Sequence, residues 1–214
     1  MILRRLNQSS SYMINVENFK SAILSGVAVG IAGFGFLALR DIVGSVLFAF
    51  ALLTVVGYKL KLYTGTAGFI KKNELPYLAF VLCGNWVGCF LMAMLTHCSA
   101  MDLQGSAQEI LAGRLALGPL RGGLLAIGCG FIMTTAVQFA RQKQYLPLLF
   151  GVPLFIVCGF THCVADAFYY LCVPLDFWMA NALQILGVYA SIVLGNLIGC
   201  NLYRIVLSKD QYAD

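Results

Sequence analysis

His162 and Asp166 are ionisable side chains four residues apart, at the end of a segment that is otherwise apolar. Residues i and i+4 share a face of a helix, so the carboxylate of Asp166 can approach the imidazole of His162. Gly159-Phe160-Thr161 precede the histidine directly, and glycine with a polar residue favours an interruption in an apolar helix. We therefore predict that His162 and Asp166 form a pair beside a helix break, in which the imidazole can bind a proton. The alternative is that Asp166 points to a neighbouring helix and accepts from donors there.

A second interruption is predicted at residues 62–68, where two threonines and two glycines follow Leu62-Tyr63. Thr64 is its candidate functional residue. A threonine hydroxyl at a break can donate a hydrogen bond to a passing solute, or it can cap backbone groups that the break leaves without partners. The sequence leaves both roles open.

One short motif occurs twice, as Gly84-Asn85-Trp86-Val87-Gly88 and, 111 residues later, as Gly195-Asn196-Leu197-Ile198-Gly199, each followed by cysteine. Glycines four residues apart allow two helices to pack closely in lipid. The asparagines are less easily explained by packing, since an amide in hydrocarbon must find hydrogen-bond partners. The backbone of a broken neighbouring helix would supply them.

The elements that must position these residues follow from composition. The chain is 60% hydrophobic and 11% charged, with a mean hydropathy of +0.85. Soluble domains carry about 25% charged residues, so a soluble enzyme, a nucleic-acid-binding domain and a disordered chain are excluded. A helix needs about 20 apolar residues to span a bilayer. Six charge-free runs of 17 to 27 residues predict six spans: Ser21–Leu39, Ile42–Tyr58, Leu75–Met101, Gly122–Ala140, Gln144–Ala165 and Phe177–Tyr203.

The fold class expected is thus an all-α polytopic membrane protein, with residues 1–214 forming one transmembrane domain. The repeated motif lies in the third and sixth spans, which predicts an inverted repeat of three plus three helices with breaks in spans two and five. When the loops are assigned alternately to the two sides of the membrane, one side carries eleven basic residues and the other three. Because the more basic side of a membrane protein is usually cytoplasmic, both termini are expected in the cytoplasm, with a segment at 1–19 and a tail at 204–214. The side with fewer basic residues, which we call the minority side, carries Arg40, Arg114 and Arg121.

Together these motifs make the chain resemble the formate/nitrite transporter family of pentameric channels. That family has Leu-Phe-Thr at a break in helix two, Gly-Asn-x-x-Gly in helices three and six, and His-Ser-[Val/Ile]-Ala-Asn in helix five. Here these read Leu62-Tyr63-Thr64, the two Gly-Asn motifs, and His162-Cys163-Val164-Ala165-Asp166. The resemblance covers nearly the whole chain.

By the resemblance, Thr64 and His162 face the pore. Phe48 and Leu52, sixteen and twelve residues before Thr64, and Phe155, seven before His162, match constriction residues. Arg114 falls where the family has a vestibule lysine, sixteen residues before Gly130, which replaces an asparagine. Asp166 replaces another asparagine, and we expect it to change how His162 holds a proton.

The implied function is a channel for small monovalent anions of weak acids, such as formate, nitrite or hydrosulfide, with proton linkage. The implied setting is a homopentamer in the bilayer of a bacterial inner membrane, without cofactor, metal or nucleic acid. A channel for water or small neutral solutes shares the aquaporin-like plan, but none of the five prolines follows an asparagine, as that class requires. A membrane enzyme of thiol or quinone chemistry is disfavoured because the eight cysteines form no CxxC pair. An assembly protein would not need His162 and Asp166 within a span.

Overall fold

The computed structural model describes residues 13–207, and in that range the secondary structure is helical, without a β-strand. The all-α prediction is confirmed. Residues 1–12 of the predicted cytoplasmic segment and 208–214 of the predicted tail lie outside the described residues. Helix α2 begins at Val16, inside the predicted 1–19 segment, because Asn15 accepts a hydrogen bond from the backbone of Asn18 and caps it. Helix α11 (Leu202–Val206) extends into the predicted tail.

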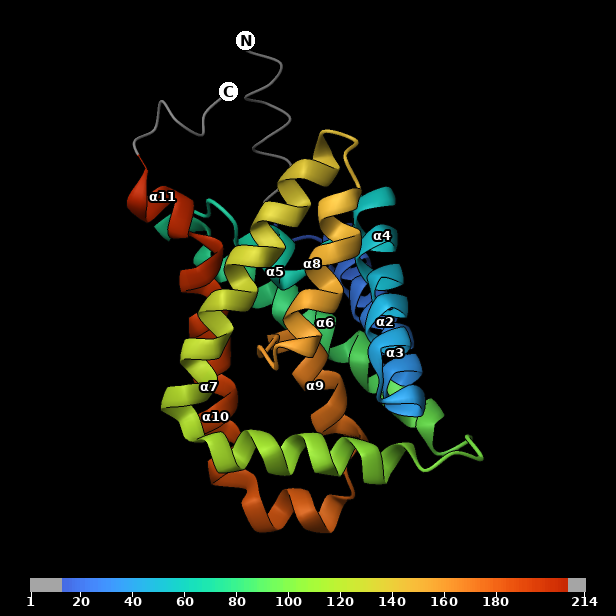
Figure 1. The fold of residues 1–214 in the computed structure, drawn as a ribbon. Coiled ribbons are helices and arrows are strands. Elements are labelled where there is room, and N and C mark those ends of the chain that lie inside the picture. The colour runs from blue at the N-terminus through green and yellow to red at the C-terminus, as the bar shows by residue number, and fades with distance from the viewer. Residues whose placement is uncertain (1–12, 208–214) are drawn as a thin grey trace.

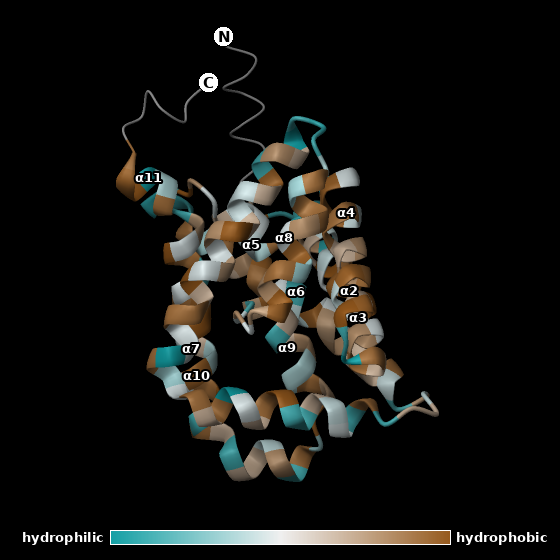
Figure 2. Cartoon of the chain, viewed as in Figure 1, coloured by the Kyte–Doolittle hydropathy of each residue, from teal (hydrophilic) through white to brown (hydrophobic). Residues whose placement is uncertain are grey.

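Four helices in the described range are long and apolar enough to cross a membrane. They are α2 (Val16–Leu39), α6 (Leu75–Thr96), α7 (Leu103–Arg141) and α10 (Leu175–Cys200). Large apolar side chains are exposed on these helices, such as Leu183 on α10, which is 89% exposed in the single chain. Figures 1 and 2 show the helices, and Figure 2 marks hydrophobic residues along them. An apolar surface of this extent is what a membrane protein presents to lipid or to neighbouring subunits.

Between these long helices lie two interrupted segments. The first consists of α3 (Ile42–Leu47), α4 (Ala49–Gly57) and the short α5 (Tyr63–Ala67), and the second of α8 (Leu146–Val157) and α9 (Cys163–Cys172). A single 3₁₀ turn, η1 (Lys72–Glu74), precedes α6. The chain is non-helical at residues 58–62 and 158–162, near the middle of the molecule (Figure 1).

The two breaks close in the same way. The N–H of Leu60 donates to the carbonyl of Val55 at 2.8 Å, and the N–H of Phe160 donates to that of Phe155 at 2.9 Å. Each bond reverses the chain around a residue in the left-handed region, as helix ends commonly do. That residue is Gly159 (φ +71°) in the second break and Lys59 (φ +54°) in the first. The first break therefore lies before Thr64, and most of the predicted interruption at 62–68 forms helix α5.

Asn85 on α6 holds the first break in place. Its Oδ1 accepts from the backbone N–H of Tyr63 at 2.9 Å, and its Nδ2 donates to the carbonyls of Lys61 and Ala22 at 2.9 and 2.8 Å. The side chain is fully buried. The amide thus satisfies groups that the broken helix leaves without helical partners, as the sequence predicted.

Asn196 on α10 makes the matching contacts at the second break. Its Oδ1 accepts from the N–H of Cys163 at 2.8 Å, and its Nδ2 donates to the carbonyls of Thr161 and Ala126 at 3.1 and 2.8 Å. In both halves one amide therefore joins the break, the start of the following short helix and a long helix alongside.

The glycines of the repeated motif permit this close packing. Helix α2 packs along α6, and α7 packs along α10. A Cβ added to Gly88 would overlap the backbone oxygen of Ile23, and one added to Gly199 would overlap that of Ile127. In the same way, a Cβ on Gly84 or Gly195 would strike an alanine side chain on the facing helix. The predicted packing role of these glycines agrees with the structure.

Helix α7 differs most from the sequence prediction. The fourth apolar run begins at Gly122, but α7 begins at Leu103 and bends at Gly118, whose φ of +72° interrupts the helix before Pro119. Asp102 caps its start by accepting from the N–H of Gly105 at 2.8 Å. Residues 103–117 form a leg that lies across one end of the molecule (Figure 1). They cover the site described next.

Candidate functional site

His162 caps helix α9 and turns its ring toward the first break. Its backbone is extended (φ −127°, ψ 115°), and its Nδ1 accepts from the N–H of Ala165 at 3.2 Å. Because Nδ1 accepts, a neutral ring carries its proton on Nε2. Nε2 lies 3.0 Å from Oγ1 of Thr64, so the ring donates to that hydroxyl. Two predicted site residues that are 98 positions apart thus meet in the core.

The hydroxyl of Thr64 keeps its own hydrogen for another acceptor. Its oxygen is occupied by the ring of His162, and the side chain is 1% exposed at the start of α5. A hydroxyl that accepts from one partner can donate to a second one. The Thr64–His162 pair therefore offers a single O–H donor in otherwise apolar surroundings.

Asp166 does not pair with the imidazole, so that prediction was wrong. Its Oδ1 accepts from Nε of Arg114 at 3.1 Å, and its Oδ2 accepts from the backbone N–H of His162 at 3.1 Å. The i, i+4 argument fails because His162 is the extended cap and not a helical residue. The alternative, in which Asp166 reaches a neighbouring helix, agrees with the structure.

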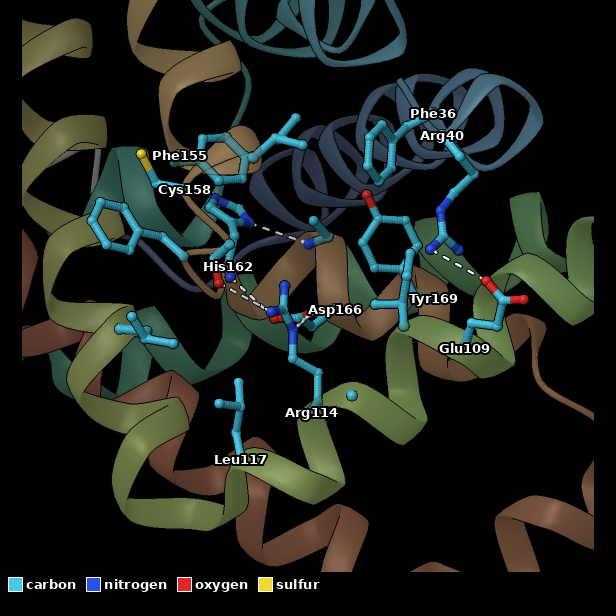
Figure 3. Close-up of a pocket in the computed structure, with 17 residues that line it drawn as sticks. Phe36, Arg40, Glu109, Arg114, Leu117, Phe155, Cys158, His162, Asp166 and Tyr169 are labelled. Carbon is cyan, nitrogen blue, oxygen red and sulfur yellow. Dashed lines mark hydrogen bonds and ion pairs between the residues drawn. The ribbon is translucent and has the colours of Figure 1, made fainter. Parts of the chain in front are cut away.

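Arg114 stands on the first leg of α7 and bonds both to the second break and to the helix that follows it. Besides its ion pair with Asp166, its Nη1 donates to the carbonyl of Gly159 at 3.1 Å. Its side chain is 17% exposed, against 1% for Asp166. The predicted vestibule cation thus lines the expected cavity, but its charge is compensated (Figure 3).

An aromatic pair lies beside the histidine. The rings of Phe48 and Phe155 meet edge to face at 6.1 Å, and Phe155 stacks on the ring of His162 at 5.6 Å. Phe48, Phe155 and Leu52 are each buried, at 1%, 3% and 2% exposure. The three predicted constriction residues therefore lie in the interior and not on a lipid-facing surface.

Two cavities approach this centre from opposite sides. The first, which we call the paired cavity, has a volume of about 450 Å³ and is lined by Phe155, His162 and two ion pairs, Arg114–Asp166 and Arg40–Glu109 (Figure 3). The second, the basic cavity, has a volume of about 590 Å³. It reaches Gly65, next to Thr64, and its basic lining residues are Lys59, Lys61, Arg141 and Lys143.

Several of these lining residues were not recognised as site residues from the sequence. Glu109 is paired with Arg40 at 3.4 Å, and no spacing rule connects positions so far apart. Lys59 and Arg141 were read only as topology signals. The sole sequence signal for the basic cavity is that residues 59–61 and 141–143 follow spans ending on the same side.

The comparisons with known proteins identify the family and the fold. A family model described as formate/nitrite transporter matches residues 8–208. No curated protein sequence matches the chain significantly. A solved structure described as a pentameric formate channel with formate bound is 20% identical, with a TM-score of 0.76 over 92% of this chain and 97% of that one.

A second solved structure, described as an ion channel of the FNT family, is 19% identical, with a TM-score of 0.74 over 93% of this chain and 90% of that one. At these identities the structural likeness establishes the fold alone. The family match covers most of the sequence, and it is a family of channels and transporters, not of enzymes. The chain is therefore a multi-pass membrane protein that belongs to the formate/nitrite transporter family.

Proposed function

We propose that the protein is a channel for small monovalent anions of weak acids, such as formate, nitrite or hydrosulfide, with proton linkage. The observation that carries the proposal is the hydrogen bond between Thr64 and His162. It joins the start of α5, directly after the first break, to the last residue of the second break. His162 lines the paired cavity, and Gly65, next to Thr64, lines the basic cavity. The pathway consists of these two residues with Phe48, Leu52 and Phe155 around them.

An anion meets an apolar barrier at this centre. Desolvating an ion costs several kcal/mol, so a small anion crosses the aromatic constriction only with compensation. The O–H of Thr64 supplies one donor, and the N-terminus of α9 directs its positive dipole end toward the same region. Protonation is the further device: a weak acid that takes up a proton crosses the barrier as a neutral molecule.

The setting of the channel follows from the same reasoning. The division of basic residues, eleven to three, favours cytoplasmic termini in a bacterial inner membrane. The exposed apolar faces fit a homopentamer as well as lipid. The solved formate channel that this chain resembles is described as pentameric.

Transport by the purified protein in liposomes tests the proposal. We expect uptake of formate, nitrite or hydrosulfide to exceed that of acetate and lactate, with proton movement reported by a pH-sensitive dye in the lumen. Thr64→Val keeps the side-chain shape and removes the hydroxyl, so it should reduce uptake without changing assembly. Osmotic shrinkage measures the alternative, since rapid water flow with no anion uptake would assign a neutral-solute channel and refute the proposal.

A further inference from the structure

The two cavities have opposite electrostatic characters. In the paired cavity each of the two basic side chains has an acidic partner, Glu109 for Arg40 and Asp166 for Arg114. In the basic cavity no acidic residue is among the described lining residues. The third basic residue of the minority side, Arg121, does not line the paired cavity.

Position, as well as number, distinguishes these charges. Asp166 lies one turn into α9, directly behind His162, and its carboxylate holds Arg114 at the mouth of the constriction. Lys59, Arg141 and Lys143 stand at the opposite mouth, and Arg141 donates to the carbonyl of Gly65, the neighbour of Thr64. An anion therefore meets a compensated mouth on one side and a cationic mouth on the other.

We propose that Asp166 makes the channel electrostatically asymmetric, so that anions at low concentration enter more readily from the basic cavity than from the paired cavity. This inference rests on the proposed anion channel. Clefts of one charge raise the local concentration of counter-ions. Three cations about 8 Å from an anion in water raise its concentration about fivefold in ~10 mM salt, and high salt removes most of this effect.

The rates at which charged reagents modify a cysteine in each cavity report the electrostatic potential there, and no transport is needed for the measurement. Cys158 is exposed and lines the paired cavity, so it is a natural reporter there. In the basic cavity Gly57→Cys supplies the second reporter, since a Cβ at Gly57 meets nothing within 4 Å. Each is treated with anionic and cationic methanethiosulfonates of similar size, and peptide mass spectrometry identifies the modified cysteine. Rates are divided by those of a free small thiol.

At about 10 mM salt three cations that concentrate an anion about fivefold dilute a cation about fivefold, so we expect the anionic reagent to react about 25-fold faster than the cationic one at the cysteine introduced by Gly57→Cys. At Cys158 the two rates should be nearly equal. Asp166→Asn removes the partner of Arg114 and should raise the anionic preference at Cys158 about threefold. Glu109→Gln is the second variant, since Glu109 is 76% exposed and its loss uncovers Arg40 in the same cavity without disturbing the core.

Anion currents through the protein in a planar bilayer provide the functional test. At low symmetric salt the anion current entering from the basic cavity should exceed the reverse current severalfold, and Asp166→Asn should reduce this ratio. Equal reagent preferences at the two cysteines, or a Cys158 rate unchanged in both Asp166→Asn and Glu109→Gln, would overturn the asymmetry. Reagent preferences as expected in a protein that carries no anion would support the asymmetry and refute the channel.

Discussion

Replacing either buried asparagine tests the view that the two breaks are held by equivalent hydrogen bonds. Asn85→Ala and Asn196→Ala each remove two hydrogen bonds to backbone groups around a break and one to a carbonyl of the long helix alongside. These groups cannot pair with water in the core of the protein, and those at the break have no helical partner to replace the lost bond. We expect both variants to be destabilised, and by similar amounts.

The magnitude follows from counting these bonds. A hydrogen bond inside a membrane protein contributes about 0.6 kcal/mol, and an ordinary protein hydrogen bond about 1 kcal/mol. Three bonds per asparagine therefore predict a loss of about 2–3 kcal/mol for each variant. Whole domains are stable by about 5–15 kcal/mol, so the loss would be readily measured.

The assay is reversible unfolding of the purified protein in mixed micelles with increasing SDS. Asn181→Ala is the matched control, because that amide donates only to Phe177, one turn back in the same helix. Its loss should cost less than about 0.5 kcal/mol, as for most surface changes. The reasoning would be refuted if Asn85→Ala or Asn196→Ala cost no more than the control, or if the two differed by more than about 1.5 kcal/mol.

Further variants test the packing, the donor and the constriction. Gly199→Ala should impair folding, because the new Cβ overlaps a backbone oxygen, whereas Gly35→Ala meets nothing within 4 Å and should stabilise α2 by up to about 1 kcal/mol; thermal unfolding of both compares them. Thr64→Val should lower anion uptake at least severalfold and, because it leaves the buried Nε2–H of His162 without its acceptor, cost about 1–3 kcal/mol in SDS unfolding; wild-type uptake would leave Thr64 only a structural role. Phe155→Ala should raise the passage of larger acids such as lactate relative to formate, and an unchanged ratio would show that this ring does not limit size.

Much of the fold was predictable because the features that determine it are local or repeated. Charge-free runs show where apolar helices lie, and the two Gly-Asn motifs show where helices pack closely. The all-helical fold and the family were confirmed. The leg at residues 103–117 was missed because it carries charges, and hydropathy detects only the helix after Gly118.

The site was predictable in its members but not in their pairing. Thr64 and His162 were found from the sequence, but the partner of Asp166 was not, since Arg114 is 52 positions away on another helix. The spacing rule for helices presupposes helical backbone at both residues, and His162 is extended. The first break was misplaced because glycine and threonine were taken as its signal, while the chain turns at Lys59.

Lys59 links the stability of this channel to its electrostatics. A non-glycine residue in the left-handed region costs about 1–2 kcal/mol, and the second break avoids that cost with Gly159. Lys59→Gly should therefore stabilise the fold while removing a charge from the basic cavity. Directed evolution for heat resistance alone should therefore select glycine at this position. The resulting channels should be more stable but transport less at low anion concentration. Selection for transport in scarce anion should keep the strained lysine.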